Sequence, residues 1–349
     1  MIVKNESASI GRCLNSVQNI VDEIIIVDTG STDDTKEIVS KFTQQIYDFP
    51  WVDNFAAARN FSFSKAKSAF ILWLDADDEI LQRDQEKFID LKASVDETVD
   101  SVTMNYNLTF DKYRNVTSSL RRNRLVKRVN NFQWIGAVHE YLEVSGKIID
   151  SEVSITHDKI KIYDSNRNLQ IYENRLAKGE KFSPRDLFYY ANELNDHRKF
   201  KKAISFYQKF LATRQGWVED NLAACGKISD CYRELGNSQN ALKYVLRSFK
   251  YDTPRAEFCC RLGWHYMQEE KYKQAVFWYK LATDLEKPLN WGVINNSCWT
   301  WLPHLQLCVC YDRLGRHELA YKHNELAAEF IPDDHMIIYN RNYLKTVLK

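Results

Sequence analysis

The first part of the chain alternates short apolar runs with amphipathic stretches. EIIIVD (23–28) and AFILWL (69–74) are apolar runs bounded by polar residues. Runs of this length are typical of strands buried on both faces. Turn and capping residues at 29–35 precede a helix expected to end near Phe42, and residues 55–67 have a second helical pattern. This alternation predicts an α/β domain with a Rossmann-like, largely parallel sheet.

The second part, residues 183–349, has helical periodicity with a recurring mark. An alanine recurs every 34 to 45 residues, with a small residue twelve positions before it. The alanines are Ala203, Ala241, Ala275 and Ala320, and the small residues are Ala191, Ser229, Gly263 and Cys308. The pattern resembles the tetratricopeptide repeat, a two-helix unit of about 34 residues whose helices cross closely at small residues. It predicts four degenerate units, which present a concave surface to a peptide or protein, or act as a structural cap or dimerisation module.

Length and charge restrict the function classes. A chain of 349 residues suits about two domains, expected at 1–165 and 183–349 with a helical linker at 166–182. A net charge of +1 is too small to attract the phosphate backbone of nucleic acid, so a nucleic-acid-binding function is not expected. No apolar run approaches the ~20 residues of a membrane helix, and the start does not read as a signal peptide, so we expect a cytoplasmic protein.

The eight cysteines are expected to be buried and reduced. Seven lie beyond residue 224, and Cys259 and Cys260 are adjacent within a helical pattern. A zinc site would require C-x-x-C pairs or Cys/His spacings repeated at a distance, which this sequence lacks. Cysteines without such spacing in a cytoplasmic chain behave as small apolar residues.

Acidic residues follow the predicted strands. Asp28 ends the first apolar run, and Asp75 and Asp77 come directly after the second. The carboxyl ends of parallel strands meet at one crevice, and an Asp-x-Asp pair places two carboxylates near one cation. By itself this pair is also explained by a charged turn. Asp78 and Glu79 are expected only to begin the next loop or helix.

Five segments in order make the acidic motif specific. They are MIVKNE (1–6), CLNSV (13–17), DEIIIVDTGSTDDT (22–35), WVDNFAAARN (51–60) and ILWLDADDE (71–79). Up to about residue 160 the chain resembles the nucleotide-sugar half of family 2 glycosyltransferases with the GT-A fold. With its repeats, it is similar to the bacterial branch that includes sublancin-type peptide S-glycosyltransferases. The resemblance implies an inverting enzyme that uses a nucleotide sugar, most often a UDP-sugar, and a peptide, protein or saccharide acceptor.

The resemblance assigns a nucleotide-sugar site. Residues at the end of the first strand would cradle the nucleotide, Asp28 would read the uracil or ribose, and Arg59 would lie near the nucleotide. Gly136 would let the backbone approach the donor sugar. The complete expected donor set is Val3, Asn5, Glu6, Asp28, Arg59, Asp75, Ala76, Arg124 and Gly136.

The resemblance also assigns metal ligands and a base. Asp77 would ligate Mn²⁺ or Mg²⁺, Asp75 would contact the ribose or the metal, and His157 would complete the metal shell. For His157, a polar residue at a strand end is an equally good interpretation. Glu140, in GAVHEYL, falls where the family places the acid that activates the acceptor. His139 either orients Glu140 or hydrogen-bonds nearby backbone.

The basic run at 121–128 has two interpretations. Arg124 or Lys127 would meet the diphosphate or the acceptor, whereas the other basic residues are explained as charges that guard a strand edge. The chain departs from the family in two places, because it begins inside the expected first strand and has Asn54 where relatives often have aspartate.

Two rival functions remain open. One is a non-catalytic binding or scaffold protein with a degenerate transferase domain. The other is a sugar-phosphate nucleotidyltransferase, which would require a glycine-rich basic loop where this chain has KNES (4–7).

Overall fold

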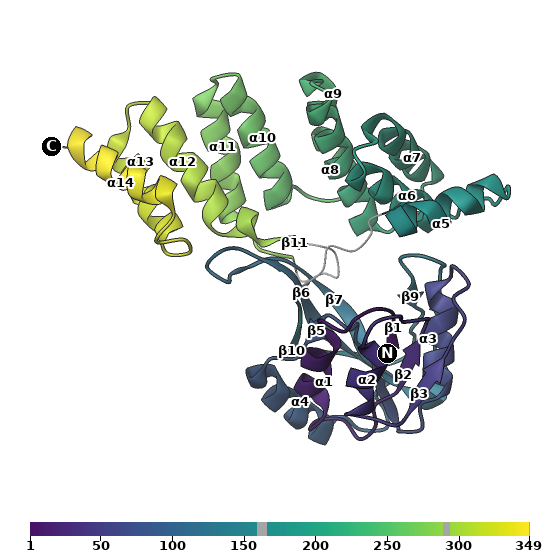
Figure 1. Cartoon of the computed structure of the whole chain (residues 1–349). Helices are drawn as coiled ribbons and strands as arrows, with labels where there is room; N and C mark the ends of the chain where they lie inside the picture. Colours follow the sequence, from purple (N-terminus) through teal and green to yellow (C-terminus); the bar gives the residue numbers. More distant parts are fainter. Residues whose placement is uncertain (159–165, 289–293, 349) are drawn as a thin grey trace. The chain divides into compact units, whose positions relative to one another are not determined.

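The protein consists of two compact units (Figure 1). This computed structural model describes residues 1–158, 166–288 and 294–348. The first unit comprises residues 1–109 and 119–181, and the second comprises residues 110–118 and 182–349. The first unit therefore includes the helix at the start of the predicted linker. The α/β class of the first part and the helical class of the second are confirmed.

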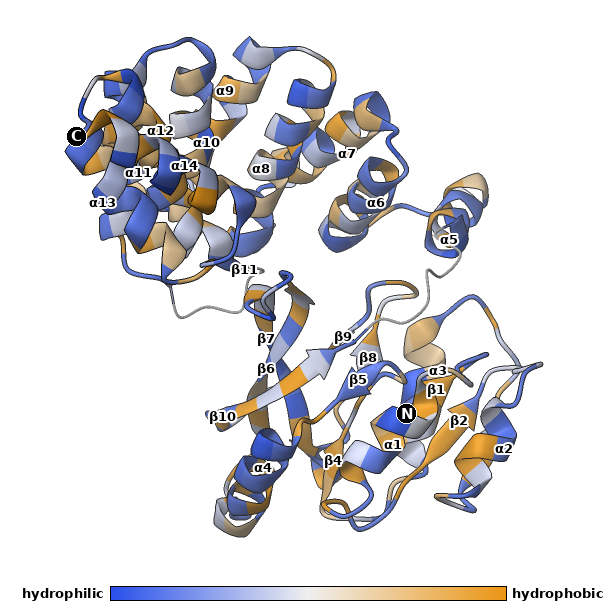
Figure 2. Ribbon diagram, turned by 60° about the vertical axis from the view of Figure 1, so that its left-hand side comes forward, coloured by the Kyte–Doolittle hydropathy of each residue, from blue (hydrophilic) through white to orange (hydrophobic). Residues whose placement is uncertain are grey.

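A small parallel sheet carries the start of the chain. Its strands, in spatial order, are β1 (Ile2–Val3), β2 (Ile26–Asp28) and β3 (Ile46–Asp48). The connecting helices are α1 (Ile10–Val17), α2 (Thr35–Ser40) and α3 (Phe55–Ser64). Ile10 and Leu14 of α1 pack with Ile26 of β2 in a buried cluster. Figure 2 shows the apolar character of β2, as expected for a strand covered on both faces.

A larger mixed sheet completes the first unit. Within this unit the strands follow the spatial order β7-β6-β10-β5, with β4 paired to β7. The strands are β4 (Phe70–Leu72), β5 (Asp78–Glu79), β6 (Ser101–Phe110), β7 (Val116–Lys127) and β10 (Ile148–His157). The two-residue strand β11 (Ile294–Asn295) belongs to the second unit. β10 runs parallel to β6 but antiparallel to β5, and β4 is antiparallel to β7. The largely parallel arrangement expected from the sequence thus describes the first sheet, while the second is mixed.

A short hairpin presents the GAVHE segment. β8 (Trp134–Ile135) pairs with β9 (Tyr141–Leu142), and residues 136–140 form the turn between them. Gly136 has a φ of 106°, a conformation that favours glycine. The Phe55 N–H, at the start of α3, donates to the Ala137 carbonyl over 2.9 Å. This hydrogen bond ties the turn to α3.

Three further elements belong to the first unit. They are α4 (Gln82–Ser94), the 3₁₀ turn at Arg128–Asn130, and α5 (Asn166–Ala177).

Asn54 caps α3 by accepting a hydrogen bond from the Ala57 N–H over 3.0 Å. Asparagine caps helices as well as aspartate does, so the departure from the family pattern at this position leaves the cap intact.

The second unit contains the four predicted two-helix repeats. The helix pairs are α6 (Pro184–Asp196) with α7 (Phe200–Thr213), α8 (Val218–Glu234) with α9 (Ser238–Ser248), α10 (Ala256–Gln268) with α11 (Tyr272–Asp284), and α12 (Trp301–Arg313) with α13 (His317–Ala328). A 3₁₀ turn (Asn296–Trp299) precedes α12, and α14 (His335–Val347) follows the last pair. Each marker alanine lies on the second helix of its pair. Figure 2 shows polar and apolar residues alternating along these helices.

Residues 110–118 fold with the last repeat helices. Tyr113 packs on Leu305, Ala327, Ile331 and Ile337. Nearby, the Lys112 ammonium lies 3.1 Å from Asp334, and the Asn115 side chain donates to the Phe330 carbonyl over 2.9 Å. The second unit therefore combines two separate stretches of the chain.

All eight cysteines are free thiols and buried, which confirms the prediction from their spacing. Among the helices in the described ranges, none combines the length and apolarity needed to cross a bilayer.

Candidate active site

A cavity of about 550 Å³ lies at the carboxyl ends of β1 and β2 and beside the loop after β4. Seven of the predicted site residues line it: Val3, Asn5, Glu6, Arg59, Asp75, Ala76 and Asp77. Six further residues line the same cavity and were not in the predicted set: Ile2, Lys4, Thr29, Trp51, Phe55 and Arg167. Trp51 and Phe55 belong to the quoted WVDNF segment, so their motif pointed to the site, whereas Arg167 on α5 carried no sequence signal.

A second cavity of about 570 Å³ has a different character. It is lined mostly by apolar side chains, among them Phe63, Phe70, Leu72 and Phe88. Because it contains none of the predicted site residues, the first cavity is the better candidate for chemistry.

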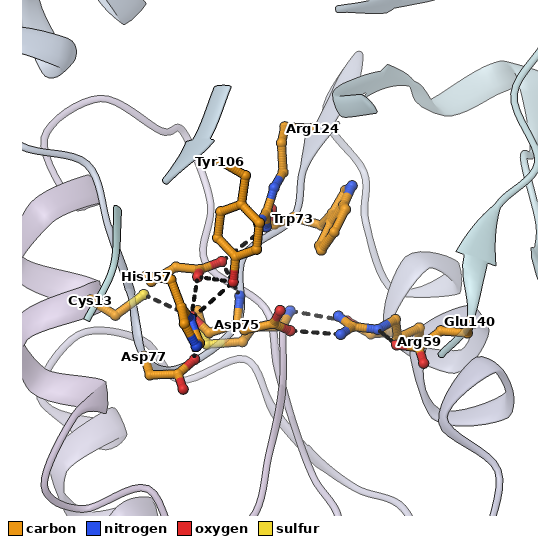
Figure 3. A network of polar contacts seen from close by, with 12 residues as sticks. Cys13, Arg59, Trp73, Asp75, Asp77, Tyr106, Arg124, Glu140 and His157 are labelled. Carbon is orange, nitrogen blue, oxygen red and sulfur yellow. Dashed lines mark hydrogen bonds and ion pairs between the residues drawn. The ribbon is translucent and has the colours of Figure 1, made fainter. Parts of the chain in front are cut away.

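Arg59 connects two predicted site acids (Figure 3). Its Nη2 donates to Asp75 Oδ1 over 2.6 Å, and its Nε donates to Glu140 Oε1 over 2.5 Å. Burial alone would raise the pKa of Asp75, but the guanidinium groups of Arg59 and Arg124 more than offset it and hold that pKa well below its usual range. Asp75 is therefore an ionised group whose charge is already partly balanced by protein.

Two indole rings hold the Arg59 guanidinium. Its central carbon lies 4.7 Å from the centroid of Trp134 and 5.2 Å from that of Trp73. The Trp134 backbone is fixed by the side chain of Asn60 on α3. This amide donates to the Trp134 carbonyl and accepts from the Trp134 backbone N–H. The two rings meet edge-to-face with their centroids 4.7 Å apart, so Arg59 lies beside this pair, where cation–π attraction stabilises its guanidinium.

Asp77 and His157 form the other half of the site. The His157 Nδ1 lies 3.5 Å from Asp77 Oδ1. Burial raises the pKa of Asp77 to about 6, since the nearby His157 only partly offsets the loss of solvation. Burial would lower the pKa of His157, but its hydrogen bonding and proximity to the carboxylates of Asp78 and Asp77 raise it overall. Within the described ranges, His157 is the one basic side chain at ion-pair distance from Asp77.

Asp78 corrects one expectation, because it does more than begin the next element. It is fully buried, and the β10–β5 register places His157 opposite it. Its Oδ2 accepts from Arg124 Nη1 and from the Asp75 N–H, both over 2.9 Å, and its Oδ1 accepts from the Tyr106 hydroxyl over 2.8 Å. Together with Asp77 and His157 it forms the acidic cluster in the described residues that could hold a metal ion. Since both of its oxygens are engaged, we assign Asp78 to supporting the loop.

Arg124 also occupies a place that the sequence did not indicate. It is fully buried, and its guanidinium carbon lies 3.9 Å from the Trp73 centroid and 4.2 Å from the Tyr106 centroid. It lies outside the lining of the cavity and donates to Asp78. In this structure it therefore supports Asp78, and its contact with the donor stays a prediction.

Asp28, Gly136 and His139 do not line the cavity. Asp28 is buried and accepts from the N–H groups of Gly30 and Ser31, each over 3.0 Å. Gly136 and His139 lie in the turn before Glu140, where His139 also has a positive φ of 51°. The site thus brings together the Asp75–Arg59–Glu140 and Asp77–His157 groups, while the donor contacts expected of Asp28 and Gly136 stay predictions.

Two family models match parts of the chain. Residues 1–144 match the family described as glycosyl transferase family 2. Residues 222–253 and 256–288 match the tetratricopeptide repeat, and these are the second and third predicted units.

Curated relatives match parts of the chain. It is 39% identical over 97 residues to a TPR repeat-containing protein of Synechococcus elongatus, covering 28% of this chain and 23% of that protein. It is 41% identical over 87 residues to an uncharacterized glycosyltransferase of Rickettsia prowazekii, covering 25% and 30%. It is 29% identical over 231 residues to the glycosyltransferase SunS of Bacillus subtilis, covering 60% and 51%. The chain thus spans from about a quarter to half of the length of these relatives.

Proposed function

From the premise that a family 2 glycosyltransferase domain is joined here to tetratricopeptide repeats, we propose that the protein transfers a sugar from a UDP-sugar with inversion at the anomeric carbon. One observation carries the proposal: the Asp75–Ala76–Asp77 loop lines a cavity of about 550 Å³ at the carboxyl ends of parallel strands. Such crevices are the usual ligand sites of α/β sheets.

The residues around Asp77 fit a divalent cation. Burial raises the pKa of Asp77 to about 6, and His157 compensates its charge only in part. A divalent cation would therefore stabilise the ionised Asp77 carboxylate more than His157 does. Asp77 and His157 would hold Mn²⁺ or Mg²⁺ with one oxygen and one nitrogen. The ion would supply neutralisation of the charge that develops on the leaving diphosphate. Asp75, which is already paired with Arg59, would contact the ribose or the metal from its remaining oxygen.

Glu140 is the proposed base that removes the acceptor proton. It lies outside the lining of the cavity, and its contact with Arg59 leaves its side chain only 10% exposed. We therefore infer that Arg59 releases Glu140 when the donor diphosphate binds, because a diphosphate competes for the same guanidinium. One carboxylate base without an enzyme nucleophile corresponds to a single displacement, and hence to inversion.

The repeats are proposed to hold a peptide or protein acceptor. Repeat arrays bind such ligands on a concave surface, which supports this choice over a saccharide acceptor. A cytoplasmic location stays a prediction. The competing hypothesis, a scaffold with an inactive transferase domain, differs in one measurable respect, since it requires no turnover.

The test is UDP release from several UDP-sugars with Mn²⁺ or Mg²⁺, with and without EDTA. We expect release that depends on the metal, and a loss of at least about 100-fold in Asp77→Asn. Glu140→Gln should bind UDP normally but transfer sugar slowly. Asp22→Asn is the matched control, because that aspartate is exposed and pairs with Lys92 away from the cavity. Full activity in EDTA or in Asp77→Asn would contradict the metal-dependent mechanism, and no release with any donor would favour the scaffold.

A further inference from the structure

The Tyr106 hydroxyl lies between two groups of the site (Figure 3). Its oxygen is 2.8 Å from Asp78 Oδ1 and 2.9 Å from His157 Nδ1. Tyr106 is buried on β6, and its neighbours lie on β5 and β10. These strands are adjacent in the sheet, in the order β6-β10-β5. The hydroxyl is therefore fixed by the strand register and not by a mobile loop.

A count of hydrogens decides the direction of the two bonds. A phenol has one hydrogen to donate, and an ionised carboxylate can only accept. Asp78 is ion-paired with Arg124 over 2.9 Å, so the Tyr106 hydrogen must point at Asp78. A tyrosine phenol, with an ordinary pKa of about 10, keeps this hydrogen at neutral and mildly alkaline pH. The Tyr106 oxygen is left as an acceptor, and its remaining partner, His157 Nδ1, must donate.

We propose that Tyr106 is a positioning residue that keeps the hydrogen of neutral His157 on Nδ1 and leaves the Nε2 lone pair for a divalent cation. The role of the cation rests on the proposed function, whereas the position of the hydrogen does not. A ring nitrogen that donates to a second group while the other binds the metal is a common way to orient a histidine ligand.

The surroundings of Nδ1 support the same assignment. Besides Tyr106, it faces Asp78 Oδ1 at 3.4 Å and Asp77 Oδ1 at 3.5 Å. These are acceptor oxygens, and a lone pair on Nδ1 would be repelled by all of them. The Tyr106 ring is itself held against the Arg124 guanidinium. The carboxylate, the phenol and the imidazole therefore form one chain of donors and acceptors with a single direction.

The first test is the ¹⁵N spectrum of the histidine side chains in metal-free protein at mildly alkaline pH. The chain has eight histidines, and the His157 signals are assigned from their absence in His157→Gln. We expect the downfield shift of an unprotonated ring nitrogen at Nε2 and a protonated nitrogen at Nδ1. The reverse pattern would overturn the proposal. This measurement needs neither a metal, a donor nor a folded variant of Tyr106.

The second test is a titration of Tyr106→Phe with Mn²⁺. Binding is monitored through the electron paramagnetic resonance signal of the free Mn²⁺. Loss of the partner that orients His157 should weaken Mn²⁺ binding about 10- to 100-fold. It should also change the ratio of the two His157 tautomers. Tyr207→Phe is the matched control, since it removes a buried tyrosine hydroxyl bonded to Asn192 in the repeats. Unchanged ¹⁵N shifts and Mn²⁺ affinity in Tyr106→Phe would contradict the positioning role.

The outcomes separate this proposal from the proposed function. If wild-type protein shows the Nδ1–H tautomer but binds no Mn²⁺, the hydrogen placement holds and the metal-dependent mechanism fails. If Mn²⁺ binds and supports transfer while His157 carries its hydrogen on Nε2, the function holds and the role given to Tyr106 is wrong.

Discussion

Two aspartates separated by one residue have opposite electrostatic environments. Burial raises the pKa of both Asp75 and Asp77, but Asp75 is paired with Arg59 and its pKa ends below the usual range. Asp77 has only the partial charge compensation of His157, and its pKa ends at about 6. A cation would be stabilised most where protein charge is missing, which is at Asp77. In this loop Asp75 is thus paired with the Arg59 guanidinium, and Asp77 is left for the proposed metal.

The double pairing of Arg59 can be tested by Arg59→Lys. A lysine ammonium is a point charge without the planar fork, so it cannot hold Asp75 and Glu140 at once while lying beside Trp73 and Trp134. We expect sugar transfer to fall about 100-fold, the effect of misplacing a reacting group by about 1 Å. The measurement is the steady-state rate of UDP release with the best donor.

Arg121→Lys is the control for this exchange. Arg121 is also held by several acceptors, including Asn105 Oδ1 at 3.1 Å and the Ser151 carbonyl at 2.7 Å, but it does not line the cavity. Arg59→Lys with wild-type kinetics would show that the pairing of Asp75 and Glu140 through one guanidinium has no part in transfer.

At this scale the sequence predicted the residues of the motif but not their partners. Asp75 and Asp77 follow from Asp-x-Asp in an ordered set of segments. The role of Asp78 depends on Tyr106 and Arg124, which are 28 and 46 residues farther along the chain. Which face of β6 or β7 meets a given loop is set by sheet register, and periodicity within one strand does not report it.

At the scale of elements, the repeats depend on close helix crossings. The marker position before each alanine is Ala191, Ser229, Gly263 or Cys308, and it lies on the first helix of its pair. The sequence predicted these crossings because a small residue leaves room for the second helix. At Gly263 there is no room for a side chain, since an added Cβ would lie 2.6 to 2.8 Å from three ring atoms of Tyr279.

Gly263→Ala is therefore expected to destabilise the second unit. Alanine gains about 1 kcal/mol of helix propensity over glycine, but overpacking costs about 1 to 3 kcal/mol. Tyr279 is 1% exposed and cannot swing away, which places the cost at the upper end. We expect a net loss of about 1 to 2 kcal/mol in the free energy of unfolding, measured by urea denaturation.

Two further variants make this prediction specific. Ser229→Ala changes the matching position of another repeat without adding volume, and it should not lower the denaturation midpoint. Tyr279→Leu combined with Gly263→Ala removes the clashing ring edge, so the two changes should be non-additive. Additive losses would show that the Gly263–Tyr279 contact is not the cause.

The elements themselves were mostly predictable, whereas the pairing between them was not. β2, β4, α2 and α3 lie within or close to the ranges that periodicity indicated. The antiparallel pairing of β4 with β7 joins residues 70–72 to 125–127. Such long-range pairing is decided by the packing of both faces, so a local pattern predicted only a strand and its burial.

For the whole molecule, the second unit is assembled from chain segments far apart in sequence. Residues 110–118 belong to it, although they lie within the part of the chain predicted as the transferase domain. Tyr113 supplies an aromatic ring to the cluster around Ile331 and Ile337. Nothing in the pattern of residues 110–118 indicated this, because the partners lie some two hundred positions later, as in the Asn115–Phe330 hydrogen bond.

Tyr113→Ala tests this assembly. Removing a half-buried ring from an apolar cluster should cost about 1 to 2 kcal/mol, below the value for a fully buried aromatic side chain. The loss should appear as faster amide hydrogen exchange in α13 and α14, measured by mass spectrometry. Arg114→Gln, at the exposed next position, should leave that exchange unchanged. Faster exchange confined to residues 110–118 would contradict the packing, because a ring that stabilises α13 and α14 cannot be removed without raising the rate at which those helices open.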